Sequence, residues 1–501
     1  MGTRRQWKPV LVIGATGYVG GRLVKLLLRK GCHVRAMARS LDKLRARFPE
    51  AHHRFEGVRG NVLDPVSLRQ AADGCRAAYY LVHSMSSGRK FVATDRRAAH
   101  NMARAASAAG LERIIYLGGI GGEGVSDSRH LASRYEVGRI LRKGPVPVTI
   151  LQAAVILGSG SASFEIIRYV VDRLPVIVAP KTLFTRCQPI CIRDVLGYLV
   201  ACLARDETIG QTYDIGGPDI LTYKDLIDLY SKHAGLGRRR TIILPFFGLG
   251  LVSYLVGLIT PVPRHLVSPL IRGLGHEVIC RDSRIRDIVP QRLMSCDQAI
   301  QRALEKISQQ IVDTYYTDAG MVHRPEWVEK GDEPYSGGAI MSCAYHIRIR
   351  TSADQVWELI KNIGGDTGWY FAGRLWWLRG FMDKLVGGVG LDRGRRHPRR
   401  IQIGDVLDFW RVLDVRIHRR LVLLAEMRLP GEAILEFIVE SRDGAHTELT
   451  MNARFLAKGL AGLVYWYSVS PFHDYVFKGM LANIAKKCNA GVITGPRRMD
   501  D

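Results

Sequence analysis

Three glycines near the start of the chain have the spacing of a loop that grips phosphate. Gly14, Gly17 and Gly20 follow the apolar run Val10–Ile13 and lead into helix-forming residues up to Leu28. Glycine permits a tight turn, lets the backbone approach a pyrophosphate and lets the helix pack close to the strand. The first N–H groups of that helix and its positive end would hold the phosphates. Strand, turn and helix together predict a dinucleotide-binding site.

An arginine after the next predicted strand indicates which dinucleotide binds. The run His33–Ala38 is typical of a strand and is followed by Arg39, with no acid before Asp42. A carboxylate at this position would bind a ribose 2′-hydroxyl, whereas a guanidinium suits a 2′-phosphate. We therefore expect NADP, with NAD as the alternative, although a surface arginine after a strand would give the same pattern.

Residues after the later apolar runs complete the predicted cofactor site, because the carboxyl ends of parallel strands face the ligand crevice. The third strand and its turn, Val58–Leu63, contain Asn61, which we expect beside an adenine. The fourth strand, Ala77–Val82, ends in His83 and Ser84, which are candidates for the region of the nicotinamide ribose. The predicted cofactor-binding residues are Gly14, Thr16, Gly17, Tyr18, Val19, Gly20, Arg39, Asn61, Val62, His83, Ser84, Gly118 and Gly119.

Strands and helices alternate through the first 235 residues. Helical runs such as Ser67–Ala72 and Asp95–Ala109 separate the apolar strands, and the fifth strand, Arg113–Leu117, leads into a glycine-rich loop. Alternation at this interval predicts a right-handed, doubly wound parallel sheet. We therefore expect an α/β doubly wound domain over residues 1–235.

Several motifs of this part carry a family resemblance. GATGYVG after the first strand, Arg39 after the second, Asn61 after the third and LGGIGG after the fifth occur together with LQAAVILG, QPICIRDV and YDIGGPDILTY. Over roughly the first 300 residues the chain resembles an atypical short-chain dehydrogenase/reductase of the NmrA-like and isoflavone-reductase-like kind. The resemblance implies a Rossmann fold, NAD(P) binding and reductase activity.

The expected catalytic set departs from that family's pattern. Typical members place a Tyr-x-x-x-Lys pair after the fifth strand, where the tyrosine moves a proton and the lysine lowers its pKa. Aligning SRYEVGRIL places His130 at the tyrosine and Arg134 at the lysine, and Gly118 or Gly119 at the usual serine. We assign His130 to proton transfer and Arg134 to a ribose hydroxyl, with Tyr135 as a second candidate acid. An oxidoreductase with a degenerate catalytic set and a protein that only binds the cofactor both remain open.

A segment of the middle region is long enough to suggest a membrane span. The 18 residues 242–259 carry no charge, which reaches the threshold for a transmembrane candidate. Pro245 near its start and the flanking Pro261 and Pro263 argue against a span. In the resembled family this region is a helical cover on the substrate side. We therefore expect residues 236–325 to be a helical extension of the first domain, with 242–259 a buried or interfacial helix.

A second domain follows a polar linker over residues 326–340. Residues 341–349 alternate as a strand and Ser352–Asn362 forms a capped helix. These features, later strands and a closing helix over His473–Lys487 resemble the START-like, polyketide-cyclase-like helix-grip fold. GWYFAGRLWWLRG and YWYSVSPFHDYVF resemble a domain of unknown function commonly fused behind atypical reductase domains. We expect an α+β helix-grip domain over residues 341–490.

Aromatic residues mark a candidate ligand cavity in that second domain. Seven of the eight tryptophans lie at position 327 or later. Their rings offer large apolar area with polar handles, which suits an extended or ring-shaped apolar ligand. Packing in the core is the alternative for each of them. The predicted substrate-binding residues are Trp369, Trp376, Trp410 and Trp466.

Charge and cysteine usage narrow the partners. The formal charge is +25, but the basic residues are spread along the chain and are not interleaved with aromatic residues, so specific nucleic-acid binding is not expected. Peripheral membrane association stays open, and no oligomeric state is predicted. Nine cysteines without a repeated CxxC pair favour a reducing, cytoplasmic setting without a metal site.

These patterns predict a function in outline. We expect an NADP-dependent reductase that acts on a hydrophobic carbonyl or enoyl substrate held by the C-terminal domain. The alternatives are a non-catalytic redox sensor that binds NADP(H), and a lipid-binding protein in which the cofactor is structural.

Overall fold

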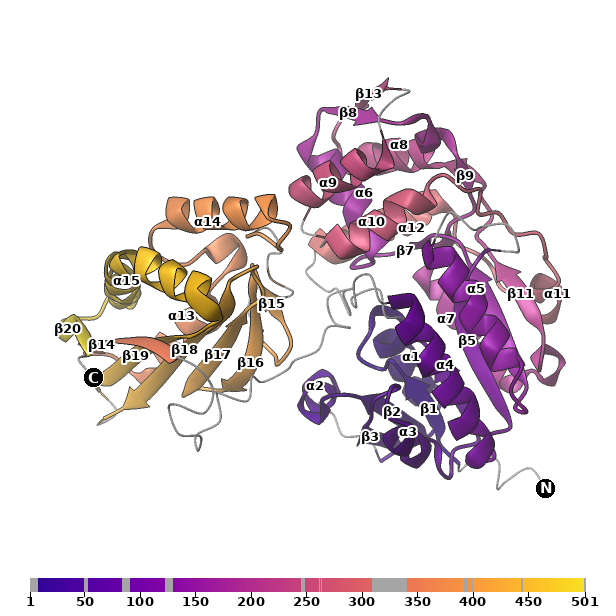
Figure 1. Cartoon of the computed structure of the whole chain (residues 1–501), viewed down its shortest axis with the longest axis horizontal. Coiled ribbons are helices and arrows are strands. Elements are labelled where there is room, and N and C mark those ends of the chain that lie inside the picture. The colour runs from indigo at the N-terminus through magenta and orange to yellow at the C-terminus, as the bar shows by residue number, and fades with distance from the viewer. Residues whose placement is uncertain are drawn as a thin grey trace. The chain divides into compact units, whose positions relative to one another are not determined.

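The computed structural model divides the chain into two compact units, Met1–Gly320 and Met321–Asp501. It describes residues 8–48, 53–82, 91–121, 129–244, 248–260, 262, 264–308, 340–391, 395, 397, 400–442 and 445–499. The first unit runs from indigo to rose in Figure 1 and the second from orange to yellow. The predicted boundaries at 235, 325 and 340 remain predictions.

The first unit is built on a seven-stranded, fully parallel sheet. Its strand order is β11-β6-β5-β4-β1-β2-β3, so the direction of winding reverses between β1 and β4. This confirms the predicted doubly wound Rossmann sheet and places the ligand crevice at that reversal. The strands are β1 (Val10–Ile13), β2 (Val34–Ala38), β3 (Phe55–Arg59), β4 (Ala77–Tyr80), β5 (Arg113–Gly119), β6 (Val148–Ala153) and β11 (Thr212–Ile215).

Helices cover both faces of this sheet, which explains why its central strands β1 and β4 are buried at every position and carry no charge. Along β1, Val10 and Val12 belong to one hydrophobic cluster, and Leu11 and Ile13 belong to the other. The first cluster includes side chains of α1 (Tyr18–Arg29) and α7 (Ile192–Ala204). The second includes side chains of α3 (Pro65–Ala72), α4 (Phe91–Ala108) and α5 (Arg129–Arg142). A short helix, α2 (Leu41–Arg47), follows β2.

A helical subdomain with its own core completes the first unit (Figure 1). Its elements are α6 (Ala162–Arg173), α8 (Tyr223–His233), α9 (Leu249–Ile259), α10 (Arg264–Gly273), α11 (Ile285–Ile288), α12 (Cys296–Ser308), and the short strands β7 (Ile156–Leu157), β8 (Val176–Ala179), β9 (Arg186–Cys187), β10 (Ile190–Cys191), β12 (Leu221–Thr222) and β13 (Arg240–Ile243). The subdomain therefore draws on residues before position 235 as well as after it.

The expectation of one continuous helix over residues 242–259 is wrong. Residues 240–243 instead form β13, which pairs in parallel with β8, and α9 begins only at Leu249. Every second residue of β13 is exposed, which is typical of a strand with one side facing solvent. Pairing with β8 therefore decides the structure of these residues, although their hydrophobicity favoured a helix. Among the described residues no helix has the length and apolar character needed to cross a bilayer.

The second unit is an antiparallel α+β structure. Its seven strands have the order β15-β16-β17-β18-β19-β14-β20. They are β14 (Ile340–Ile349), β15 (Val406–Leu407), β16 (Trp410–Arg416), β17 (Arg420–Ala425), β18 (Gly431–Ser441), β19 (Thr447–Ala457) and β20 (Val492–Met499). Three helices accompany the sheet: α13 (Ala353–Lys361), α14 (Gly373–Leu385) and α15 (Gly459–Lys487).

The closing helix is longer than the sequence pattern predicted. α15 begins at Gly459, whereas the predicted start was His473. The helix runs through Pro471, which removes one backbone hydrogen bond of the helix. Helix α14 was not predicted, since its apolar residues lie all around the helix and have no amphipathic period.

Candidate functional site

The glycine loop has the geometry of a phosphate grip. The N–H of Gly17 donates to the carbonyl of Gly14 at 2.9 Å, and Gly14 has a left-handed φ of 88°. Helix α1 begins directly after Gly17, and no side chain caps its first N–H groups. A Cβ on Gly20 would lie 2.2 Å from the Gly14 carbonyl oxygen. The helix therefore approaches the loop as closely as backbone permits, with its N-terminal end available to an anion.

The side chains of Tyr18 and Arg22, in the first turns of α1, pack against each other and against the chain near Ser159. The guanidinium of Arg22 lies 4.3 Å from the centre of the Tyr18 ring and donates to the Ser159 carbonyl at 3.0 Å. The Tyr18 hydroxyl is buried, which raises its pKa. Of the residues predicted to bind cofactor, Tyr18 therefore points its ring into the protein, and only its backbone faces the loop.

Two arginines follow β2. Arg39 comes directly after the strand and is exposed, and its contact with a 2′-phosphate stays a prediction. Arg47, at the end of α2, is buried and donates to the carbonyl of Thr16 inside the glycine loop. Sequence reasoning missed Arg47. The N-cap Ser40 signals the start of α2, but no sequence pattern shows that the end of this helix returns to the loop.

The loop after β3 is fixed by its own hydrogen bonds. The strand ends at Arg59, so Asn61 and Val62 lie in a turn. The Asn61 side-chain oxygen accepts from the Leu63 N–H at 3.1 Å, and the Val62 carbonyl accepts from Asn101 at 3.0 Å. Asn61 itself is exposed. The predicted residues His83 and Ser84 lie outside the described part of the chain.

The candidate catalytic residues Arg134 and His130 lie in different places: Arg134 at the carboxyl end of β5, and His130 at the wall of a cavity. Arg134 donates to the Leu117 carbonyl at 3.1 Å, which brings its side chain to the carboxyl end of β5 beside Gly119. His130 lines a cavity, and burial together with the nearby Arg134 lowers its pKa to about 3. Tyr135, one residue after Arg134, is not among the residues lining that cavity. His130 is therefore a neutral imidazole near pH 7 and a poor donor of a full proton.

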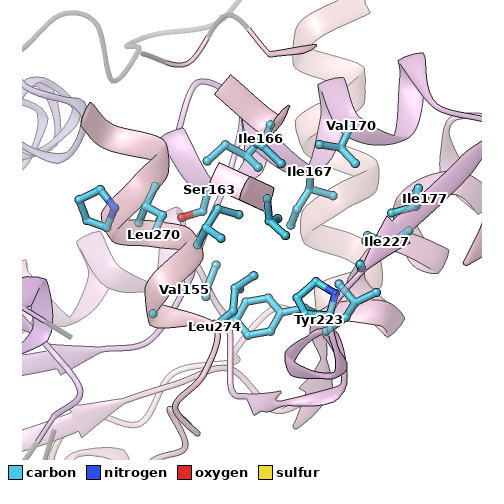
Figure 2. Close-up of a pocket in the computed structure, with 18 of the residues that line it drawn as sticks. Val155, Ser163, Ile166, Ile167, Val170, Ile177, Tyr223, Ile227, Leu270 and Leu274 are labelled. Atoms are coloured by element: carbon cyan, nitrogen blue, oxygen red, sulfur yellow. The ribbon is translucent and has the colours of Figure 1, made fainter. Parts of the chain in front are cut away.

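The cavity is apolar and has a volume of about 420 Å³ (Figure 2). It lies in the first unit, where α6, α8, α9 and α10 meet the residues that follow β6. Its polar side chains are His130, Ser163 and Tyr223, and the rest of its lining is aliphatic apart from prolines and a glycine. Figure 2 shows Ile166, Ile167 and Val170 of α6 on one side, and Leu270 of α10 and Leu274, directly after that helix, on another. Such a lining suits an apolar ligand with one or two polar atoms.

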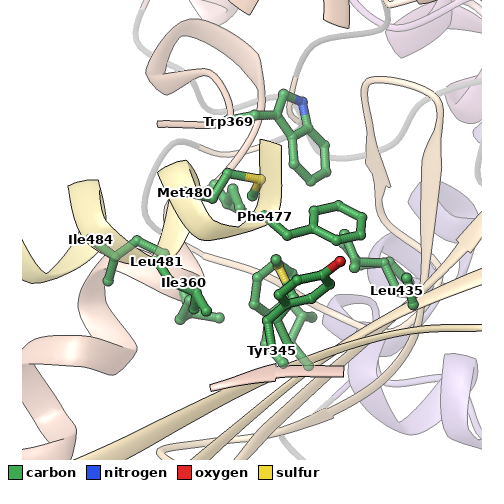
Figure 3. Close-up of a cluster of buried hydrophobic side chains, with 14 of the residues drawn as sticks. Tyr345, Ile360, Trp369, Leu435, Phe477, Met480, Leu481 and Ile484 are labelled. Atoms are coloured by element: carbon green, nitrogen blue, oxygen red, sulfur yellow. The ribbon is translucent and has the colours of Figure 1, made fainter. Parts of the chain in front are cut away.

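The four tryptophans predicted to bind substrate pack in the core of the second unit. Each is at most 7% exposed. The Trp369 ring lies 5.2 Å from that of Trp376 and 6.1 Å from that of Trp410, and Trp466 stacks on Phe455 at 5.9 Å. Figure 3 shows Trp369 above Phe477 and Met480 of α15, with Tyr345 and Leu435 of the sheet beneath. Their environment is thus one of side-chain packing, and the apolar cavity lies instead in the first unit.

Two family models match the chain. Residues 14–158 match a family described as NAD(P)H-binding, and residues 337–480 match one described as a protein of unknown function (DUF2867). Residues 14–158 of the first unit are therefore similar to NAD(P)H-binding domains, in agreement with the Rossmann order of the sheet. The second family carries no described activity.

Curated relatives match only part of the chain. Cinnamoyl-CoA reductase 1 of Oryza sativa subsp. japonica is 32% identical over 124 residues, which are 24% of this chain and 37% of that protein. The mitochondrial NADH dehydrogenase (ubiquinone) 1 alpha subcomplex subunit 9 of Arabidopsis thaliana is 27% identical over 234 residues, 44% of this chain and 56% of that protein. The chain thus covers about a third to just over half of these relatives.

Solved structures are similar at a low level. A triphenylmethane reductase from Citrobacter sp. complexed with NADP(H) has a TM-score of 0.48 and 16% identity, covering 59% of this chain and 99% of that one. A UDP-glucuronic acid 4-epimerase from Bacillus cereus in complex with NAD has a TM-score of 0.45 and 16% identity, covering 60% and 99%. Neither likeness identifies a substrate for this chain.

Replacing Gly20 with alanine should abolish dinucleotide binding. The added Cβ has to move α1 away from the Gly14 carbonyl, which removes the first N–H groups of the helix from the phosphate position. Titration with NADPH, followed by fluorescence, measures the loss, expected to exceed about a hundredfold, or about 2.7 kcal/mol. Gly250→Ala is the matched control because its Cβ meets open space. Unchanged affinity in the Gly20 variant would contradict the assigned phosphate grip.

The desolvated imidazole of His130, which lines the cavity, should make stability fall in mild acid. Its pKa in the folded chain is about 3, whereas the unfolded chain takes up the proton near pH 6.5. Between these values the unfolded state binds more protons, so stability declines as the pH drops. Urea unfolding at pH 7 and pH 5 should show that the wild type loses about 1–2 kcal/mol more than His130→Gln. Equal losses in the two proteins would show that His130 is not buried as a neutral group.

Proposed function

We propose that this protein is an NADP-dependent reductase of an apolar substrate with a carbonyl or enoyl group, bound in the cavity of the first unit. One observation carries the proposal: the apolar cavity is bounded by Ala153–Val155, directly after β6, and by His130 of α5. Both elements belong to the carboxyl side of the sheet that holds the glycine loop. The expectation that the C-terminal domain holds the substrate is replaced by this location.

Each group of residues has a distinct task in the proposed reaction. The bound cofactor supplies a hydride to the substrate carbon. The backbone of the glycine loop and of the α1 N-terminus holds the pyrophosphate, and Arg134 lies at the end of β5 where a ribose hydroxyl is expected. The aliphatic walls exclude water, and neutral His130, Ser163 and Tyr223 offer hydrogen bonds that orient the substrate oxygen. Because none of these is a strong acid at pH 7, the proton for that oxygen comes ultimately from solvent.

The preference for NADP rests on two guanidinium groups. Arg39 is exposed after β2, and Arg47 is fixed against the Thr16 carbonyl of the glycine loop. A 2′-phosphate beside β2 would gain charge-assisted hydrogen bonds from Arg39, whereas a 2′-hydroxyl would gain little. The short α2, capped by Ser40, positions Arg47 so that the loop keeps its shape when the phosphate binds.

A second candidate function is a redox sensor that binds the cofactor without turnover. The specific observation in its favour is the electrostatic state of His130, which replaces the usual catalytic tyrosine and whose pKa is lowered to about 3. In that case the cavity would hold a regulatory ligand, and cofactor binding would shift the population of its bound state.

Replacing Arg39 with aspartate should reverse the cofactor preference. The carboxylate repels a 2′-phosphate and accepts a hydrogen bond from a 2′-hydroxyl. Isothermal titration should show NADPH binding weakened by about tenfold or more, equal to about 1.4 kcal/mol, with NADH binding unchanged or tighter. Arg59→Asp is the control, an exposed arginine that ends the next strand, β3. If both variants weaken the two cofactors equally, Arg39 acts only through general charge.

Filling the cavity should abolish reduction while leaving the cofactor bound. Ile167→Trp places an indole in the cavity, whereas Ile417→Trp adds the same ring at an exposed turn of the second unit. The assay follows deuteride transfer from labelled NADPH to a panel of apolar enals, enones and quinones. We expect turnover by the wild type and by Ile417→Trp, and a loss of kcat/KM of about a hundredfold in Ile167→Trp. Tight NADPH binding with no transfer to any acceptor would favour the redox sensor.

A further inference from the structure

An apolar surface covers one side of the second unit. On α14 one side is buried, at Trp376, Gly380, Asp383 and Lys384, and most of the other residues of the helix are exposed. Trp377 is 59% exposed and stacks on Phe381 with the ring centres 5.5 Å apart. The exposed apolar side chains of α14 and the residue after it are Leu375, Trp377, Leu378, Phe381, Met382, Leu385 and Val386.

The first half of α15 continues this surface. Arg379 of α14 donates to the Tyr465 hydroxyl, and the Phe371 ring lies 4.9 Å from the Tyr475 ring, so the two helices are joined. Figure 1 shows α14 and α15 on the same side of the sheet. The exposed apolar side chains of α15 are Leu460, Val464, Tyr467, Phe472 and Tyr475. We call these residues of α14 and α15 together the outer face.

The turn that leads into α14 is held in an unfavourable conformation. Tyr370 and Ala372 have φ values of 60° and 54°, in the left-handed region that is unfavourable for residues other than glycine. The Trp369 indole N–H donates to Asp408 at 2.8 Å, and Asn483 donates to the Tyr370 carbonyl at 2.8 Å. Strain of this kind persists only where neighbouring contacts impose it, and it accumulates where a fold presents a functional surface.

The charges around the outer face are mostly basic. Arg374 is exposed at the start of α14, and Arg428 donates to the Val386 carbonyl at its other end. Asp383, the acid of α14, is buried and bonded within the unit, and residues 459–472 of α15 carry no charge. The chain as a whole has a formal charge of +25. An anionic partner therefore complements this surface, whereas a second copy of the same basic chain does not.

We propose that the outer face docks on the surface of an anionic lipid bilayer. Tryptophan and tyrosine rings favour the boundary between head groups and acyl chains, and the aliphatic side chains between them can insert to the same depth. The basic residues at the rim attract anionic head groups. This docking does not depend on the proposed reductase activity.

Vesicle flotation with the full chain tests the proposal. Vesicles of phosphatidylcholine with an equal part of phosphatidylglycerol should bind the wild type, and vesicles of phosphatidylcholine alone should bind it more weakly. The variant Trp377→Ser/Leu378→Ser/Phe381→Ser should bind the anionic vesicles at least about tenfold more weakly, because its inserted apolar area is removed. The control Val66→Ser/Ile220→Ser/Ile417→Ser removes three exposed apolar side chains elsewhere and should bind as the wild type does.

Two measurements keep the result interpretable. Near-ultraviolet circular dichroism reports whether the buried tryptophans of the second unit remain packed, and the single variant Trp377→Ser should weaken binding in the same direction if the triple variant unfolds. Absence of wild-type binding to anionic vesicles would overturn the proposal, as would equal binding by the wild type and a folded triple variant. A dimer that is lost in the triple variant, without vesicle binding, would assign the outer face to a second copy and also overturn it.

Discussion

The close approach of α1 to the glycine loop is the constraint on which the first unit depends. No side chain fits between Gly20 and the Gly14 carbonyl, so the helix axis is fixed relative to β1. Arg22 then connects α1 to the Ser159 carbonyl ahead of α6, and Arg47 connects α2 to the loop itself. The same contacts that shape an anion site therefore also attach the helical subdomain to the sheet. Gly20, Arg22 and Arg47 therefore contribute both to the shape of the proposed phosphate site and to the packing of the first unit.

The sheet of the first unit could be predicted because its central strands are buried on both faces and are followed by turn signals. Val10–Ile13 is apolar at every position for that reason, and its pairing with β2 and β4 follows from the rules for parallel sheets. The 242–259 segment could not be predicted from its composition. Its first residues pair with β8, a strand distant in the sequence, and such a long-range contact leaves no local pattern.

In the candidate site, too, the features set by neighbouring residues could be predicted, whereas those formed by residues far apart in the sequence could not. Gly14, Gly17 and Gly20 are recognisable since a turn dictates their spacing. The cavity is not, because its walls come from helices separated by more than a hundred residues, between Ser163 and Leu274. The tryptophans of the second unit show a further limit: aromatic composition is compatible with a ligand site and with core packing, and in the fold these rings pack against one another and against α15. Their role in binding substrate stays a prediction. Chemistry that depends on a cluster of polar atoms is visible in a sequence only when those atoms are close along it.

An apolar cavity of about 420 Å³ also has a consequence for how the first unit behaves when it is empty. Its lining residues, such as Ile166, Val170 and Val256, belong to the core of the helical subdomain, so the void is an interruption of packing in that core. A molecule that fills the cavity binds the folded state and not the unfolded one, and it raises the free energy of unfolding by an amount that grows with the logarithm of its concentration above Kd. The melting temperature of the protein is thus itself a detector of its ligand, and it responds whether or not the ligand reacts.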